Sequence, residues 1–126
     1  MIERLPDRNG FGDQAGYARA VRHGDLIAVS ATAALEDARI VHEGDAYGQA
    51  RVALDRALAA ARELGGHQAN VIRTRVLLAP GCDWREVMRA HKETFSAAAP
   101  ANTSYYVGGL IPEGALVEVE LDVVAG

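Results

Sequence analysis

The chain has little of several things that mark specialised protein classes. It contains one cysteine, Cys82, so it cannot form an intrachain disulfide, which fits a reducing compartment. No apolar run approaches the roughly 20 residues that a membrane helix needs. Residues 1–14 also lack the apolar core of a signal peptide. We therefore expect a soluble, cytoplasmic protein with no membrane partner.

An excess of positive charge is also missing. The chain has 13 Lys and Arg against 17 Asp and Glu, which gives a formal net charge of −4. Binding to phosphate backbones depends on clustered basic residues, whereas here the basic residues are interleaved with acids. We therefore expect no nucleic-acid partner. The length of 126 residues suits one domain with a single core, covering residues 1–126.

Common catalytic motifs are absent as well. The sequence has no G-x-S-x-G, no P-loop and no H-E-x-x-H. Its four histidines are far apart and show no metal-ligand spacing, so we expect no metal site. Cys82 follows Pro80-Gly81 at a loop and could be exposed. We expect a free, inert thiol there, because no histidine lies nearby in the sequence.

The apolar pattern that is present predicts a sheet with two helices. The first helix is expected from Asp45, a favourable N-cap, to Leu64, where Gly65-Gly66 follows. The second is expected to begin at Asp83 and to end before Pro100. The predicted strands cover residues 16–23, 26–34, 38–44, 70–79, 102–110 and 115–124. This order predicts an α+β fold, a two-layer sandwich with a mixed β-sheet and both helices on one face.

Alternation within the strands predicts which side chains face the core. In the last strand these are Val117, Val119, Leu121 and Val123, and in strand 70–79 they are Ile72, Thr74, Val76 and Leu78. The other face of the sheet has no helices to cover it. Strand 26–34 is apolar on both faces, and residues 105–107 are Tyr, Tyr and Val. We therefore expect a homo-oligomer that buries part of this open face.

Polar residues gather on single faces of three strands. These groups are Asn102, Ser104 and Tyr106; Glu118, Glu120 and Asp122; and Ser30 with Thr32. If the three strands neighbour one another, the groups can converge on the open side of the sheet near a subunit boundary. The alternative is that they are solvent-facing strand residues.

The order of these segments resembles one known family. GYARAVRHGDLIAVSATAA is similar to the N-terminal hairpin of the RidA (YjgF-like) family, and residues 45–79 are similar to its helix and central strand. PANTSYYVGGLIPEGALVEVELDVVA is similar to its C-terminal signature, a Pro-Ala-Arg strand followed by Leu-Pro and a Val-Glu-Ile-Glu strand. The resemblance implies a chorismate-mutase-like fold and a homotrimer with small-molecule clefts between subunits.

The resemblance also implies a reaction. Typical members hydrolyse reactive enamines and imines to a keto acid and ammonia, without a metal or an organic cofactor. Carried over by position, the catalytic glutamate is Glu118, and Tyr17 and Ser30 lie in the cleft with the substrate. We add Asn102 and Ser104 as expected substrate-binding residues.

One departure bears on the substrate. Asn102 stands where the family has the arginine that pairs with the substrate carboxylate, and asparagine carries no charge and has a shorter reach. This difference indicates a different substrate, which can lack the α-carboxylate. Arg19, Arg73 or Arg75 could supply a replacement charge.

Three functions are therefore weighed. The first is a divergent deaminase or hydrolase acting on an imine, enamine or related C–N compound. The second is a trimer that binds a small metabolite without turning it over. The third, an RNA-directed role, is disfavoured by the acidic composition.

Overall fold

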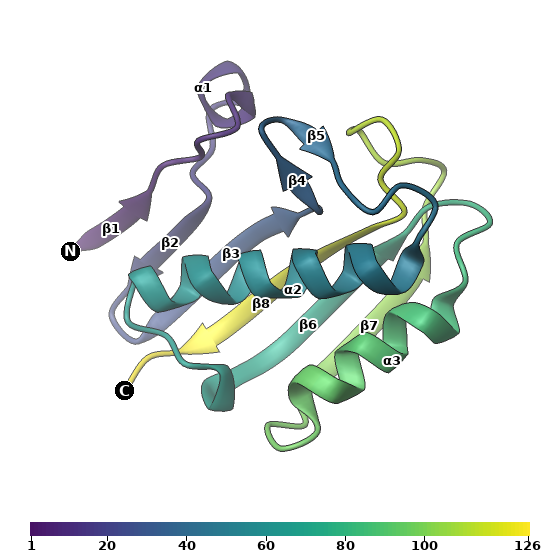
Figure 1. The fold of residues 1–126 in the computed structure, drawn as a ribbon. Coiled ribbons are helices and arrows are strands. Elements are labelled where there is room, and N and C mark those ends of the chain that lie inside the picture. Colours follow the sequence, from purple (N-terminus) through teal and green to yellow (C-terminus); the bar gives the residue numbers. More distant parts are fainter.

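The computed structural model describes residues 1–126 as a six-stranded sheet with two long helices across one face (Figure 1). The strands lie in the order β1-β2-β3-β8-β6-β7, and only β6 and β7 run parallel. Their bounds are β1 Ile2–Leu5, β2 Ala20–His23, β3 Leu26–Thr32, β6 Val71–Leu78, β7 Ala101–Tyr106 and β8 Val117–Val124. The helices are α2 Ala46–Glu63 and α3 Trp84–Phe95. The predicted α+β sandwich with a mixed sheet is confirmed.

Two N-terminal elements were not expected from the sequence. Strand β1 pairs with β2 and so extends the predicted hairpin to three strands. A short helix, α1 Phe11–Ala15, lies between Gly10 and Gly16, both of which have left-handed backbone conformations. The pattern of charged and apolar residues in β1 is too short and irregular to predict a strand, and five residues are too few to show a helical period.

The strand predicted over residues 38–44 was too long. Only β5 Arg39–Ile40 forms there, and it pairs with β4 Leu35–Glu36 in a separate two-stranded hairpin. A short turn of 3₁₀-helix, η1 Gln68–Asn70, precedes β6. The elements that build the main sheet otherwise lie within or close to the predicted ranges.

Helix α2 begins and ends as the sequence predicts. The carboxylate of Asp45 accepts a hydrogen bond from the backbone N–H of Gly48 at 2.9 Å, which caps the first turn. At the other end Gly65 has φ +93°, a conformation that glycine adopts without strain. Arg22 of β2 donates from Nη1 to the carbonyl of Leu64 at 2.7 Å, so the sheet also caps this helix end. Its buried alanines let α2 lie close to the sheet.

The core lies between the sheet and the helices. In β8, Val117, Val119, Leu121 and Val123 are all 1% exposed or less, as the alternation predicts. The prediction for β6 was wrong at one position: Ile72 is 50% exposed and Val71 is buried. A register shift between Val71 and Arg73, opposite β8, reverses the alternation at the start of the strand. Thr74, Val76 and Leu78 face the core as expected.

Cys82 is buried, which corrects the expectation that it could be exposed at its loop. Burial raises the pKa of its thiol, because a thiolate would lose solvation there. The carbonyl of Cys82 accepts a hydrogen bond from the hydroxyl of Tyr106 at 2.6 Å, which ties this loop to β7.

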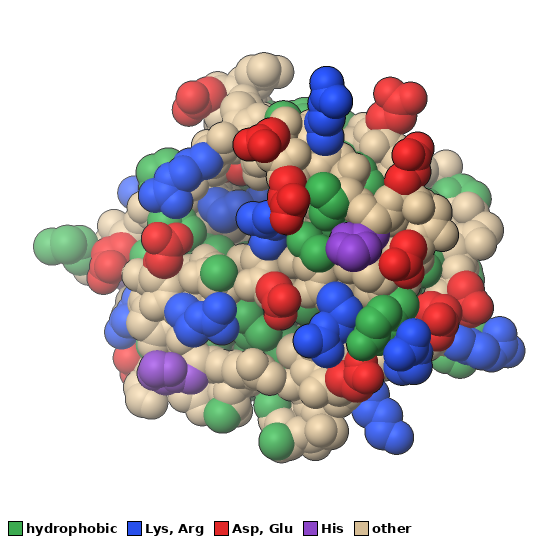
Figure 2. Space-filling model, viewed as in Figure 1, with side chains coloured by type: hydrophobic (Ala, Val, Ile, Leu, Met, Phe, Trp, Pro, Cys, Tyr) green, Lys and Arg blue, Asp and Glu red, His purple; other side chains and the backbone are tan.

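The surface above the helices carries charges of both signs, mixed together (Figure 2). No helix is both long enough and apolar enough to pass through a lipid bilayer. These observations agree with the composition, which gave no clustered charge and no long apolar run.

Candidate functional site

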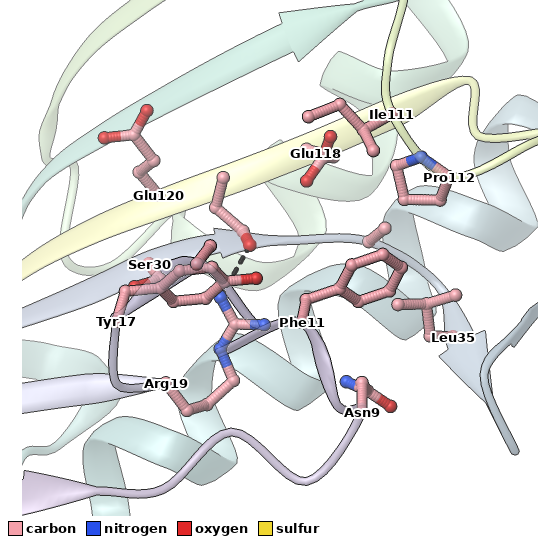
Figure 3. A pocket seen from close by; sticks show the side chains of 13 residues that line it. Asn9, Phe11, Tyr17, Arg19, Ser30, Leu35, Ile111, Pro112, Glu118 and Glu120 are labelled. Atoms are coloured by element: carbon pink, nitrogen blue, oxygen red, sulfur yellow. Dashed lines mark hydrogen bonds between the residues drawn. The ribbon is translucent and has the colours of Figure 1, made fainter. Parts of the chain in front are cut away.

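A cleft with a volume of ≈ 430 Å³ opens beside the neighbouring strands β3 and β8. The segment around α1 forms one wall, and the turn before β8 forms the other. Figure 3 shows Phe11 and Tyr17 on one side and Ile111, Pro112 and Glu118 on the other. The cleft is lined by Asn9, Phe11, Ala15, Tyr17, Arg19, Ser30, Ala31, Ala33, Leu35, Ile111, Pro112, Glu118 and Glu120.

An irregularity in β3 shapes the floor of this cleft. The pairing of β3 with β8 shifts register between Val29 and Thr32. As a result, Ser30 and Ala31, although consecutive, both line the cleft, while Thr32 is 4% exposed. The expectation that Ser30 and Thr32 share a face was therefore wrong, because a bulge breaks the period of two.

Glu118 is the second residue of β8, on the face opposite the core. Burial raises the pKa of its carboxyl group, Arg19 acts in the opposite direction, and Glu120 raises the pKa further. No hydrogen bond reaches this carboxyl from the other cleft residues (Figure 3). Glu118 is therefore a partly desolvated acid with free oxygens, the state that proton transfer requires.

Arg19 lies at the base of the cleft and is held by two partners. Its Nη2 donates to the carbonyl of Ala31 at 2.7 Å, and its Nη1 lies 3.7 Å from Oδ1 of Asp7. The Asp7 side chain is 1% exposed and also accepts a hydrogen bond from the backbone N–H of Gly12 at 2.8 Å. The Nε of Arg19 is buried without a partner. Asp7 thus links the arginine to the segment that forms one wall.

Two hydroxyl groups complete the polar part of the cleft. Ser30 donates from Oγ to the carbonyl of Ala18 at 2.8 Å, which uses its single proton and leaves its lone pairs free to accept. The Tyr17 side chain is 42% exposed, and the Arg19 guanidinium carbon lies 6.0 Å from its ring centroid. The structure therefore brings Tyr17, Ser30 and Glu118 together, although they come from separate parts of the chain.

The other two acids of β8 differ in their surroundings. Glu120 lines the cleft and lies 3.7 Å from Nη1 of Arg75. Asp122 lies 3.3 Å from the same nitrogen and does not line the cleft. Arg75 of β6 is thereby paired with both acids, and it does not itself line the cleft.

Asn102 and Ser104 do not line this cleft. Asn102 donates from Nδ2 to Oγ1 of Thr74 at 2.9 Å, and Ser104 donates to Oδ1 of Asn102 at 2.9 Å. Thr74 Oγ1 is in turn 2.8 Å from Nε2 of His91 on α3. This series of contacts, which we call the β7 network, lies on the helix side of the sheet. Within one chain, convergence of these residues with Glu118 on the open side was a wrong expectation.

The sequence did not identify the apolar walls. Phe11, Leu35, Ile111 and Pro112 come from a short helix, a two-residue strand and a turn, none of which carries a periodic signal. The glycines on either side of α1, Gly10 and Gly16, are the sequence signal that could have indicated an unusual backbone path there. The chain has no cluster of three or more His, Cys, Asp or Glu side chains that could hold a metal ion.

Comparison with known proteins agrees with this architecture. Residues 9–125 match the family described as Endoribonuclease L-PSP. The chain is 38% identical to the uncharacterized protein SCO2049 of Streptomyces coelicolor, covering 99% of this chain and 93% of the relative. It is 32% identical to the RutC family protein y4sK of Sinorhizobium fredii, covering 95% of each.

A solved structure is similar over almost the whole chain. Rv2704 of Mycobacterium tuberculosis, a member of the YjgF/YER057c/UK114 family, is 33% identical. The match has a TM-score of 0.86 and covers 99% of this chain and 100% of that one. The resemblance inferred from the sequence motifs is confirmed, and the chain belongs to the Endoribonuclease L-PSP family, the family also known as YjgF or RidA.

Proposed function

We propose that the protein is a hydrolytic deaminase that converts an imine or enamine to a carbonyl compound and ammonia. The observation that carries this proposal is Glu118, a partly desolvated carboxyl whose pKa is raised by burial, facing an apolar-walled cleft. A raised pKa keeps part of this carboxyl protonated closer to neutral pH. It can then act first as a proton donor and afterwards as a base.

The reaction needs only water and proton transfers. For an enamine, protonated Glu118 donates its proton to the carbon atom, which gives an iminium ion. The Glu118 carboxylate then accepts a proton from a water molecule as its oxygen attacks the iminium carbon. Glu118 then donates this proton to the nitrogen of the carbinolamine, ammonia leaves as the C–N bond breaks, and the Glu118 carboxylate accepts the hydroxyl proton as the carbonyl group forms. One water is consumed for each ammonia released, and Glu118 regains its proton.

The neighbouring side chains have supporting roles in this scheme. Ser30 can accept a hydrogen bond from the substrate nitrogen, because its own proton is used on Ala18. Tyr17 can donate from its hydroxyl to the substrate or to the attacking water. Phe11, Leu35, Ile111 and Pro112 limit water access and contact the apolar part of the substrate.

We also propose that the protein acts as a homotrimer with its clefts at subunit boundaries. The open sheet face supports an oligomer, since Leu26, Ile72 and Tyr105 are 62%, 50% and 45% exposed. Asn102 and Ser104 are exposed on edge strand β7, where a neighbouring copy can approach them. Light scattering coupled to size exclusion tests this: three chains per particle are expected, and a monomer at micromolar concentration contradicts it.

An RNA-directed activity has less support, although the family description contains the word endoribonuclease. The net charge is −4, and two glutamates line the cleft. Phosphate groups would be repelled there. A metabolite-binding role without turnover is the alternative, and the turnover assay separates it from the deaminase.

The assay measures ammonia and carbonyl release from imines generated in place by an amino-acid oxidase or an amine oxidase. We expect release faster than the spontaneous rate, and loss of that acceleration in Glu118→Gln. Asp122→Asn is the matched control, because Asp122 is on the same strand face but outside the cleft. No acceleration with any imine would contradict the deaminase and leave the metabolite binder.

A further inference from the structure

The charges around the cleft bear on which substrates it accepts. Among the residues that line it, Arg19 is the only cation, and Glu118 and Glu120 are acids. Asp7 lies directly behind Arg19, within ion-pair distance of its Nη1. A negatively charged ligand would therefore meet two carboxyl groups and a single guanidinium that already has a partner.

The arginine is not free to bind a second carboxylate as a full charge. The Asp7 side chain is almost completely buried, and its other oxygen accepts a hydrogen bond from the backbone N–H of Gly12, so this carboxylate is held beside Arg19. The carbonyl of Ala31 occupies one further donor of Arg19. Fork-like recognition of a carboxylate needs two parallel N–H groups and an uncompensated charge. Arg19 offers donors in the cleft but little net positive charge.

The surroundings of Glu118 lead to the same conclusion. Arg19 acts to lower the pKa of this carboxyl, yet the pKa remains raised, since burial and Glu120 outweigh the arginine. Burial, the largest cause, disfavours a ligand charge of either sign. Glu120 and an ionised Glu118 repel an anion and attract a cation, so the carboxyl groups set the preference for a ligand without a negative charge.

Within one chain, the other arginines do not change this balance. Arg75 pairs with Glu120 and Asp122, and Arg73 donates to the hydroxyl of Thr103 at 3.2 Å. Neither lines the cleft. Asn102, where the arginine of the family motif would be, is bonded to Thr74 on the other face of the sheet.

We propose that the cleft selects imines that carry no α-carboxylate, neutral or protonated, over the imines of amino acids. This inference rests on the proposed deaminase function and specifies its substrate class. The reaction is R–CH=NH₂⁺ + H₂O → R–CHO + NH₄⁺, in which water supplies the carbonyl oxygen and the C=N bond is broken. The Glu118 carboxylate stabilises the iminium charge, and the apolar walls contact R. The class of reaction that supplies such substrates is the oxidation of primary amines.

Binding measurements test the charge preference separately from turnover. The probes are phenylacetate, phenylacetamide and 2-phenylethylamine, which share a ring and differ in charge. We expect the amide and the amine to bind the full-length protein at least about tenfold more tightly than the anion, which corresponds to one good charged contact. Glu118→Gln is expected to weaken binding of the amine. Tighter or equal binding of phenylacetate, or no binding of any probe, overturns the proposal.

Turnover is then compared for one matched pair. The imine of 2-phenylethylamine and the imine of phenylalanine differ only in the carboxylate. We expect faster enzymatic hydrolysis of the first by about tenfold or more. Faster hydrolysis of the phenylalanine imine overturns the inference while the deaminase function stands. Hydrolysis of neither, with the expected binding order, overturns the deaminase function while the charge preference stands.

A charge-removing variant tests the role of Asp7. Asp7→Asn keeps an oxygen to accept from Gly12 but removes the charge that compensates Arg19. We expect phenylacetate to bind this variant about tenfold more tightly than it binds the wild type. Glu120→Gln, at the more exposed rim, is a second variant that removes an acid without disturbing the α1 segment, and a smaller gain of about two- to fivefold is expected. Unchanged phenylacetate affinity in both variants overturns the electrostatic explanation.

Discussion

The cleft beside β3 and β8 and the β7 network both place polar side chains against the sheet, but on opposite faces and in different states. In the β7 network, Ser104, Asn102, Thr74 and His91 form consecutive contacts of 2.8–2.9 Å. In the cleft, the Glu118 carboxyl has no such contact with its neighbours, and the buried Nε of Arg19 has no partner. Satisfied polar groups stabilise a fold, whereas free ones remain available to a ligand. We therefore assign stability to the β7 network and chemistry to the cleft.

Catalytic activity is expected to depend on the cleft and not on the β7 network. Glu118→Gln removes the only group proposed to transfer protons, so we expect turnover to fall by about 100-fold or more. We expect the fold to remain intact, because Glu118 alternates with the core residues of β8 and lies on the opposite face of the sheet. Steady-state ammonia release and a urea denaturation curve measure the two quantities. Comparable loss of turnover in Asp122→Asn would contradict this assignment.

The reverse experiment changes the β7 network. Thr74→Val removes the hydroxyl that contacts both Asn102 and His91, and it leaves these groups with unmet hydrogen bonds. We expect the free energy of unfolding to fall by about 1–3 kcal/mol, while turnover per folded molecule changes little. Thr74→Ser retains the hydroxyl and is the matched control. If Thr74→Val lost activity without losing stability, the β7 network would belong to the site.

The pH dependence of stability is expected to reflect the raised pKa of Glu118 in the cleft. The folded-state pKa of Glu118 is raised, so the folded protein holds this proton more tightly than the unfolded chain does. Wild-type stability therefore decreases as pH rises through the titration of this carboxyl, and Glu118→Gln lacks this decrease. We expect the variant to be the more stable protein at neutral pH and to lose this advantage in acid. Denaturation curves from pH 4 to 8 would show a constant difference if the pKa were unshifted.

His91 is expected to change the pH dependence of folding stability by a smaller amount and in the opposite direction. Burial lowers the pKa of its imidazole, so the folded state prefers the neutral ring. The neutral ring of His91 contributes to folding stability above its unfolded-state pKa. This contribution is lost as the pH falls through the lowered folded-state pKa. The wild type should lose more stability on acidification than His91→Gln does. A steeper acid loss in the variant would show that another group dominates.

The sequence predicts most of the fold because the long elements carry periodic signals. The alternation of Val117 to Val123 and the capped helix after Asp45 are strong local patterns, and the structure confirms both. The errors arise where one residue changes the register: the irregularity at Ile72 and the bulge after Ser30. Hydrophobic periodicity does not reveal a bulge in these strands. The bulge changes which residues face the core, but it does not change the amino acids on either side of it.

The candidate site was only partly predictable, because its residues come together through strand pairing that the sequence alone does not specify. Tyr17, Ser30 and Glu118 meet because β3 and β8 are neighbours, which the resemblance implied but the residues alone left open. The sequence of β7 does not predict which of its side chains point toward the helices, because Asn102, Ser104 and Tyr106 suit either face of a sheet. The compensation of Arg19 by Asp7 depends on the path of the α1 segment, which has no sequence period.

The position of β8 in the sheet has a consequence for how the protein folds. It is the last strand of the sheet in chain order, yet it lies between β3 and β6, which do not pair with each other. The strands β1 to β3 and the unit β6–α3–β7 are thus two half-sheets that no other strand joins. Each half has an unpaired edge until β8 docks. Docking of β8 therefore closes the sheet, and the same step brings Glu118 to its cleft.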